Sequence, residues 1–298
     1  MTIPRGDGAR IPGTDRGRAG ELEAAWAARV RGNREQAERV REGPAGDDFY
    51  APVSSMFVAD PRRTDDPVLD ELLALARPGE RWLDVGAGAG RFALPLALAV
   101  GEVIALEPSP AMRAALEEEA ARHGIANVRP VAATWPPDDP ALAKSVRADV
   151  VLVAHLGYDI EAIGPFLDAL EAAARTRCVA VLADGSPVTP ALPFWPLVHG
   201  EERVVLPSLP EFLALLEVRG RRVDVTRTER ASRAYPSREA ILAWLRNQLF
   251  VAEGSAADGR LLAALESRVE EDPDGLRLAG ARSGVVGIVR WAPPGATG

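Results

Sequence analysis

One short segment, residues 82–91, constrains the fold more than any other part of the chain. It reads Trp82-Leu83-Asp84-Val85-Gly86-Ala87-Gly88-Ala89-Gly90-Arg91, an apolar run that closes on an acid and leads into three glycines at alternate positions. Glycine has no Cβ, so the backbone there can turn sharply and approach a ligand closely. A buried strand, a glycine turn and a helix in this order are typical of a parallel α/β sheet whose helix N-terminus faces a bound molecule.

Short apolar runs and helical patterns alternate around this segment. The apolar runs predict buried strands at residues 81–84, 102–107, 128–132, 149–153 and 177–183. The helical patterns lie at residues 66–77, 91–100, 110–123, 140–146 and 160–176. Regular alternation of strand and helix implies right-handed crossovers and a parallel sheet with helices on both faces.

The last third of the chain has a different pattern. Residues 185–207 are rich in proline and lack periodicity, which predicts a long loop at the carboxyl end of a strand. A capping box at residues 208–211 begins a helix. Strands are expected at residues 223–228 and 285–291, and a helical insertion at about residues 236–272 lies between them.

The segments before the sheet are assigned by composition. Residues 1–20 have no apolar run and are expected to form a disordered tail. Residues 21–65 are expected to form an N-terminal helix, exposed or lid-like because its apolar stripe is sparse, and a lid segment that contains Phe49, Tyr50 and Phe57. Residues 66–298 are expected to form the single sheet-containing domain.

Rare residues and net charge exclude several classes of protein. The formal net charge of −8 argues against binding to nucleic acid or to an anionic membrane surface. Cys178 is the only cysteine, which excludes disulfide frameworks and cysteine-rich zinc sites, and no metal is expected. Lys144 is the only lysine and has no glycine-rich turn before it, which excludes a P-loop. The chain has no secretory signal pattern, so a cytoplasmic location is expected.

A second acid indicates the ligand class. Glu107 ends the second expected strand, 21 residues after Gly86, where a carboxylate can accept both hydroxyl hydrogens of a ribose. Residues 88–93 also fit the dinucleotide pattern G-x-G-x-x-A, which keeps a nicotinamide nucleotide open as an alternative. Asp84, however, would repel a pyrophosphate and would attract a cationic ligand such as S-adenosylmethionine.

In these residues the sequence resembles the class I S-adenosylmethionine-dependent methyltransferases, over about residues 66–183 and most specifically over residues 83–91. The resemblance implies a Rossmann-like α/β fold with a seven-stranded, mostly parallel sheet whose last strand is antiparallel. It implies S-adenosyl-L-methionine as cofactor, with Asp84 near its methionine part and Glu107 on its ribose. The other implied cofactor contacts are Gly86, Ala87 and Gly88 in the loop wall and Pro108, Ser109 and Met112 beside the adenine. Many members have an acid after the third strand, where this chain has Thr134 and Trp135, and Trp135 is expected to stack on the adenine.

The segment after the fourth strand is where this family builds its methyl-transfer site. Here it offers His155 as a general base or cofactor contact, Tyr158 as a substrate or packing residue, and Asp159 as a catalytic group or helix cap. The amino-methylating signature of nucleic-acid enzymes, Asp or Asn followed by Pro-Pro-Tyr, is absent from this segment, so the expected acceptor is a small, partly apolar molecule methylated on O or N. A nicotinamide-dependent oxidoreductase and a non-catalytic S-adenosylmethionine-binding protein remain as alternatives.

Overall fold

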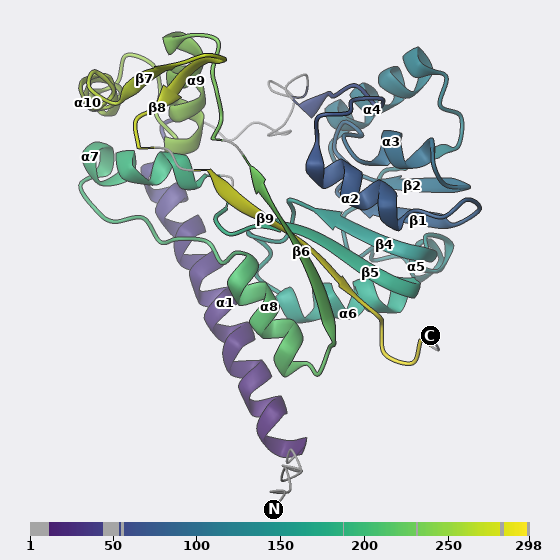
Figure 1. Ribbon diagram of the computed structural model, residues 1–298. Coiled ribbons are helices and arrows are strands. Elements are labelled where there is room, and N and C mark those ends of the chain that lie inside the picture. The colour runs from purple at the N-terminus through teal and green to yellow at the C-terminus, as the bar shows by residue number, and fades with distance from the viewer. Residues whose placement is uncertain are drawn as a thin grey trace, which may run out of the picture.

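A seven-stranded sheet forms the centre of the computed structural model, which describes residues 12–43, 54, 57–186, 188–230, 232–280 and 283–296. The strand order is β3-β2-β1-β4-β5-β9-β6 (Figure 1). The strands are β1 (Arg81–Val85), β2 (Glu102–Leu106), β3 (Val128–Val131), β4 (Ala148–Ala154), β5 (Ala174–Ala183), β6 (Val223–Arg230) and β9 (Gly284–Trp291). The first five are parallel, whereas β9 is antiparallel to both β5 and β6. The predicted mostly parallel sheet with an antiparallel last strand is confirmed.

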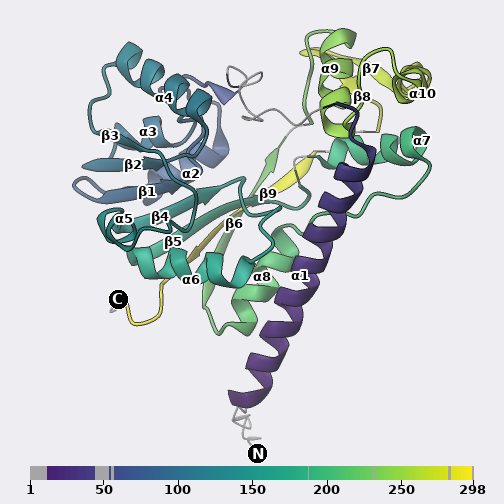
Figure 2. The ribbon, with the colours of Figure 1, turned by 180° about the vertical axis from the view of Figure 1, so that it is seen from behind.

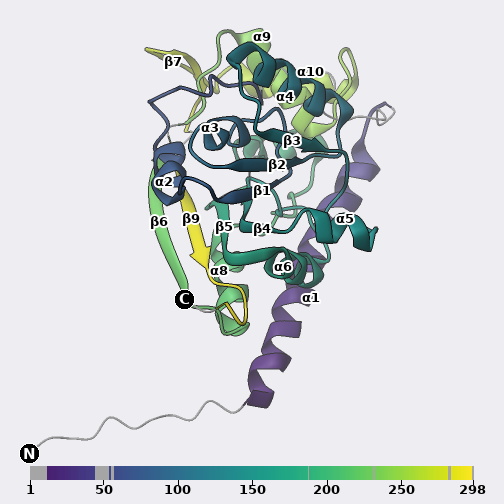
Figure 3. The ribbon, with the colours of Figure 1, turned by 90° about the vertical axis from the view of Figure 1, so that its right-hand side faces the viewer.

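Helices cover both faces of this sheet, and α3 and α6 lie on opposite sides of the strands (Figure 3). One face packs on α2 (Pro67–Leu75), α3 (Ala93–Ala97) and α4 (Pro110–His123). The other face packs on α1 (Pro12–Val40), α5 (Pro140–Ser145), α6 (Ile163–Ala173) and α8 (Leu209–Val218). Successive strand side chains alternate between the two cores, so Trp82 packs in the first and Leu83 in the second. Burial on both faces explains why the central strands are continuous apolar runs.

The N-terminal helix α1 is longer and better packed than the sequence predicted. It begins at Pro12, so residues 12–20 are helical where a disordered tail was expected, and the rest of that tail lies outside the described residues. Trp26 and Val30 are each 2% exposed and pack with α6 and α8, so the expectation of an exposed or lid-like helix is wrong. The sequence prediction failed because much of the docked face of α1 is polar. Asn33 and Gln36 on that face donate hydrogen bonds to the backbone of the loop before α8. Apolar periodicity does not reveal contacts of this kind.

The chain that leaves the sheet after β5 and again after β6 forms a cap with a hydrophobic core of its own (Figure 1). Its elements are the 3₁₀ helix η2 (Thr189–Phe194), α7 (Trp195–His199), α9 (Arg238–Leu249), α10 (Ala256–Leu265) and the hairpin β7 (Val269–Asp272) and β8 (Gly275–Leu278). Residues 185–207 were predicted as loop, but residues 189–199 are helical. Pro190 and Pro196 each lie in a first helical turn, where the missing N–H breaks no hydrogen bond within the helix.

The N-terminal helix also connects the cap to the sheet. Figures 1 and 2 show α1 running from the cap past α8 and on beyond the sheet. At the cap end, the Glu42 backbone N–H donates to the Phe250 carbonyl at 2.9 Å, and the Arg41 guanidinium lies 4.3 Å from the centre of the Phe250 ring. At the sheet, the Trp26 indole N–H donates to the Ile160 carbonyl at 2.9 Å. The helix therefore holds the cap and the sheet domain in a defined relation.

Candidate functional site

The glycine turn follows β1 and is held against the end of β2. The backbone N–H groups of Gly86 and Ala87 both donate to the Leu106 carbonyl, at 2.8 and 3.1 Å. Gly86 has φ +73°, and a Cβ there would lie 2.8 Å from Leu156 Cδ2, so this position requires glycine for two reasons. Gly88 also has a positive φ, +55°, but a Cβ there would have no heavy atom within 4 Å. The turn thus presents bare backbone to open space at Gly88.

Two acids lie buried at the ends of the neighbouring strands β1 and β2, as the sequence predicted. Asp84 is 3% exposed and Glu107 is 5% exposed. Burial, and secondarily the negative charge of Glu107, raises the pKa of Asp84 to about 7. Within the described part of the chain, no hydrogen-bond donor reaches the Asp84 carboxylate. Asp84 is therefore a buried acid whose ionised form has no compensating partner among the described residues.

Glu107 connects the glycine turn to the segment after β2. Its Oε2 accepts the Gly88 N–H at 2.9 Å, and its Oε1 accepts the Ser109 N–H at 2.8 Å. A carboxylate has about four acceptor positions, so two remain for a ligand after these bonds. The Arg113 guanidinium donates to the carbonyls of Glu107 and Pro108, both at 2.7 Å, and fixes the backbone beside the acid. The geometry suits a carboxylate that orients the turn and accepts from a bound polyol.

The residues expected beside the adenine differ in their exposure. Ser109 caps α4 by accepting the Met112 N–H at 3.1 Å, and Met112 is 2% exposed. Pro108 and Thr134 are exposed. Trp135 is partly buried against the core, and its indole nitrogen is buried without a hydrogen-bond partner among the residues that the structure describes. Trp135 therefore offers part of a ring face.

His155 lies in the loop that follows β4, next to the glycine turn. Its φ of +54° is uncommon for a residue with a side chain and marks a locally strained backbone. Its N–H donates to the Val181 carbonyl at 2.8 Å, which ties this conformation to β5. The imidazole ring lies 6.3 Å, centre to centre, from the ring of Phe92, just after the glycine turn. The structure therefore brings His155 to the glycine turn from a distant part of the sequence.

Tyr158 and Asp159 are placed differently. Tyr158 is 4% exposed within the core, and its hydroxyl oxygen accepts the Ala183 N–H at 2.7 Å, at the end of β5. This position favours the packing interpretation of Tyr158. Asp159 is exposed in a turn. It does not cap α6, because that helix begins at Ile163, three residues later than the sequence predicted.

Sequence reasoning missed two residues that shape the site, Leu156 and Phe92. Leu156 packs over Gly86, and Phe92 approaches His155. Neither has a sequence signal, because an apolar residue just after a strand (Leu156) or at a helix start (Phe92) looks like any other core residue. In the described ranges, no three His, Cys, Asp or Glu side chains are grouped so that they could hold a metal ion. None of the described helices is both long and apolar enough to cross a membrane.

Residues 83–176 match the family model described as a methyltransferase domain. The solved structure of the YcgJ protein from Bacillus subtilis superposes with a TM-score of 0.53 at 17% identity, covering 76% of this chain and 98% of that one. A candidate methyltransferase from Bacillus halodurans C-125 gives a TM-score of 0.51 at 13% identity, with the same 76% and 98% covered. No curated protein matches in sequence. The fold is that of the class I methyltransferases, as the resemblance implied.

Proposed function

We propose that this protein is an S-adenosylmethionine-dependent methyltransferase that methylates O or N of a small, partly apolar molecule. The observation that carries the proposal is the pair of buried acids, Asp84 and Glu107, on either side of a glycine turn whose Gly88 faces open space. A nucleoside ligand with a positive charge fits this arrangement, because one acid is free to pair with the charge and the other can accept from ribose hydroxyls.

The electrostatics of Asp84 favour a cationic ligand. A carboxylate that is 3% exposed and accepts no hydrogen bond from the described residues is costly to ionise, which is why its pKa is raised to about 7. The α-ammonium group of S-adenosylmethionine would stabilise the ionised form. The pyrophosphate of a nicotinamide dinucleotide would do the opposite, which weighs against the oxidoreductase alternative.

The remaining contacts are assigned by position. Glu107 would accept from the ribose with the lone pairs that Gly88 and Ser109 leave unused. Met112 and the partly exposed ring of Trp135 would flank the adenine. Gly86, Ala87, Pro108 and Thr134 would contribute backbone and exposed surface around them.

The reaction requires little acid or base chemistry from the protein. S-adenosylmethionine, when bound, would supply a methyl group on a sulfonium; the acceptor lone pair would bond to the methyl carbon as the carbon–sulfur bond breaks in line, with S-adenosylhomocysteine as the leaving group. The cap and the glycine turn hold the acceptor and exclude water, and such positioning can account for much of the rate. His155 is proposed to take up the proton that the acceptor oxygen or nitrogen loses, since an imidazole is neutral at physiological pH. Tyr158 is proposed to fix the end of β5, and no step is assigned to Asp159.

A small molecule is the proposed acceptor because the chain offers little to a nucleic acid. The net charge is −8, and the segment after β4 reads Ala154-His155-Leu156-Gly157-Tyr158-Asp159 without the amino-methylating signature. The cap adds an apolar core with several aromatic rings. Phe57, expected in the lid, is 42% exposed, while Phe49 and Tyr50 lie outside the described residues.

Calorimetric titration of the full chain with S-adenosylhomocysteine and with NAD tests the cofactor. We expect binding of the first and none of the second. Binding of NAD alone would replace this proposal with the oxidoreductase. A screen of small acceptors with methyl-labelled S-adenosylmethionine then tests turnover. No transfer to any acceptor, despite tight cofactor binding, would favour a non-catalytic S-adenosylmethionine-binding protein.

A further inference from the structure

The cap contains a pocket that shares no residue with the glycine turn. It lies where η2, α7 and α9 meet α1, and its cavity volume is about 70 Å³. Its lining is Asn33, Val188, Ala191, Leu192, Trp195, Arg203, Gln248, Leu249 and Phe250. Apart from Arg203 and two side-chain amides, these residues are apolar or aromatic. The pocket thus combines one cation with a largely apolar wall.

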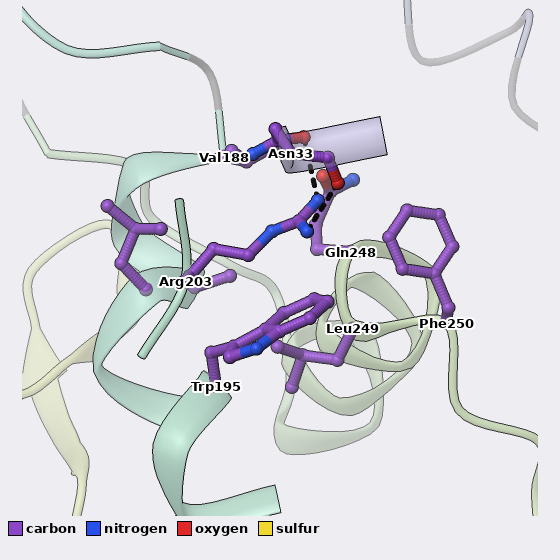
Figure 4. A pocket seen from close by; sticks show the side chains of 9 residues that line it. Asn33, Val188, Trp195, Arg203, Gln248, Leu249 and Phe250 are labelled. Carbon is purple, nitrogen blue, oxygen red and sulfur yellow. Dashed lines mark hydrogen bonds between the residues drawn. The ribbon is translucent and has the colours of Figure 1, made fainter. Parts of the chain in front are cut away.

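Arg203 is held rigidly in this pocket. Its guanidinium lies 4.0 Å from the centre of the Trp195 ring. Its Nη1 donates to the Asn33 carbonyl at 2.6 Å and to Gln36 Oε1 at 3.3 Å, and its Nη2 donates to Asn33 Oδ1 at 2.7 Å. Figure 4 shows the guanidinium between Asn33 and the face of Trp195, with Gln248 and Phe250 to one side. A guanidinium has five N–H donors, so two remain after these three bonds.

Arg203 forms no ion pair in the described ranges. No carboxylate there lies within 4 Å of its guanidinium; the negative charge of Glu201, two residues earlier, acts on Arg203 only at longer range, because Glu201 pairs with Arg39 at 2.6 Å. Burial lowers the pKa of Arg203 to about 10, which shows that the charge is partly removed from water. A partly buried charge is usually paired, because losing water without gaining a counterion is unfavourable. The pocket therefore favours an anion.

We propose that this pocket binds a small carboxylic acid with a flat apolar body. The carboxylate would accept from the two unused N–H donors of Arg203, and the apolar body would pack on Val188, Leu192 and Phe250, apolar lining residues that are only partly buried. One guanidinium balances one negative charge, which favours a carboxylate over a phosphate that carries close to two. The inference does not depend on the proposed function, because it concerns binding at residues that the glycine turn does not use.

The experiment compares 3-phenylpropionate with 3-phenylpropionamide, which has the same shape without the charge. Each is titrated into the full chain, without cofactor, and its Kd is measured by ligand-observed NMR. We expect the acid to bind about tenfold more tightly than the amide, as charge-assisted hydrogen bonds to a guanidinium imply. In Arg203→Gln the acid and the amide should bind with about the same Kd. Equal binding of acid and amide to the wild type, or no binding of either, would overturn the inference.

Two controls separate recognition from structural support. Gln36→Ala removes a side chain that bonds Arg203 and the Val204 N–H but does not line the pocket, so it loosens the same loop and keeps the cation. Gln36→Ala should still bind the acid more tightly than the amide. If this variant lost the preference, the order of the loop, and not the charge of Arg203, would determine binding. Arg34→Gln removes an exposed cation of the same helix that pairs with Glu161, and it should leave the preference unchanged, since a fall there would indicate a nonspecific charge effect. S-adenosylhomocysteine titrated into the same variants tests the proposed function separately, because its binding should survive all three changes.

Discussion

Replacing Asp84 with asparagine should make the cofactor-free protein more stable at alkaline pH. In the folded protein, burial raises the pKa of this carboxyl from its ordinary value of 3.8 to about 7. Between these two values the folded chain binds a proton that the unfolded chain has lost, so the stability of the wild type falls as pH rises through this window. Because asparagine does not ionise, the Asp84→Asn variant does not lose stability in this way.

The size of the effect follows from the two pKa values. A difference of one pKa unit corresponds to 1.36 kcal/mol, so full ionisation of Asp84 costs the folded state about 4 kcal/mol at pH 8. A buried amide without a partner costs about 1–3 kcal/mol. We therefore expect Asp84→Asn to gain about 1–3 kcal/mol of unfolding free energy at pH 8. It should gain nothing at pH 4, where the folded wild-type carboxyl is protonated and the unfolded one is only partly ionised, so that little of the wild-type stability has yet been lost.

Urea unfolding at a series of pH values measures this difference, with Asp258→Asn as the matched control. Asp258 is also buried, at 2% exposure, but it pairs with Arg246 through two bonds of 2.8 Å, and its hydrogen bonds to Arg246 lower its pKa. The control should therefore be destabilised at neutral pH, and its deficit should shrink as the pH falls. If the advantage of Asp84→Asn were the same at pH 4 and pH 8, the raised pKa would be wrong.

The same substitution should weaken S-adenosylhomocysteine binding by about 2–5 kcal/mol, the usual result of removing one partner of a buried charge pair. Stability and ligand binding then change in opposite directions at pH 8. A variant that gained stability and kept its affinity would show that Asp84 does not face the cofactor.

Further predictions concern the site and its surroundings. Glu107→Gln should weaken S-adenosylhomocysteine binding by about 1.5–3 kcal/mol by calorimetry, as expected for hydrogen bonds to a charged group, and an unchanged affinity in the folded variant would contradict the ribose assignment. Gly88→Asn should fold with a small loss of stability, because asparagine tolerates a positive φ better than most side chains and the space is open, but it should not bind the cofactor; retained binding would place the ligand elsewhere. Binding to the wild type near pH 7 should release a proton from Asp84, detected as a dependence of binding heat on the ionisation enthalpy of the buffer, and Asp84→Asn should show none. Tyr158→Phe should cost about 1–3 kcal/mol of unfolding free energy, because the Ala183 N–H loses its acceptor, while a large fall in kcat at unchanged stability would argue for catalysis instead.

The sheet could be predicted from sequence because its strands are buried on both faces. Continuous apolar runs separated by helical patterns leave few alternatives, and the positions of Asp84 and Glu107 followed from the strand ends. Helix ends were less certain. The helix expected at residues 160–176 gives way to β5 already at Ala174, since short apolar residues there fit either conformation.

The cap was predicted only in part. A helix was expected through Val269, whereas Val269 begins the strand β7. The signal for the hairpin was present as Asp272-Pro273-Asp274-Gly275, a turn sequence between two short strands. The contact between Leu156 and Gly86 and the unpaired charge of Arg203 depend on tertiary packing, and no local pattern encodes them.

The placement of α1 has a consequence for folding. Its partners are distant in sequence: Asn33 bonds to Val204, 171 residues later, and Glu23 pairs with Arg219, 196 residues later. Contacts of such long range form slowly, because a large loop must close before they contribute. During synthesis, Glu23 and Asn33 therefore lack these partners, and the helix cannot dock fully, until the chain beyond β5 has left the ribosome. We expect a nascent chain that ends before residue 200 to be prone to aggregation and dependent on chaperones. We also expect docking of α1 to be a late folding step that joins the sheet and the cap into one cooperative unit.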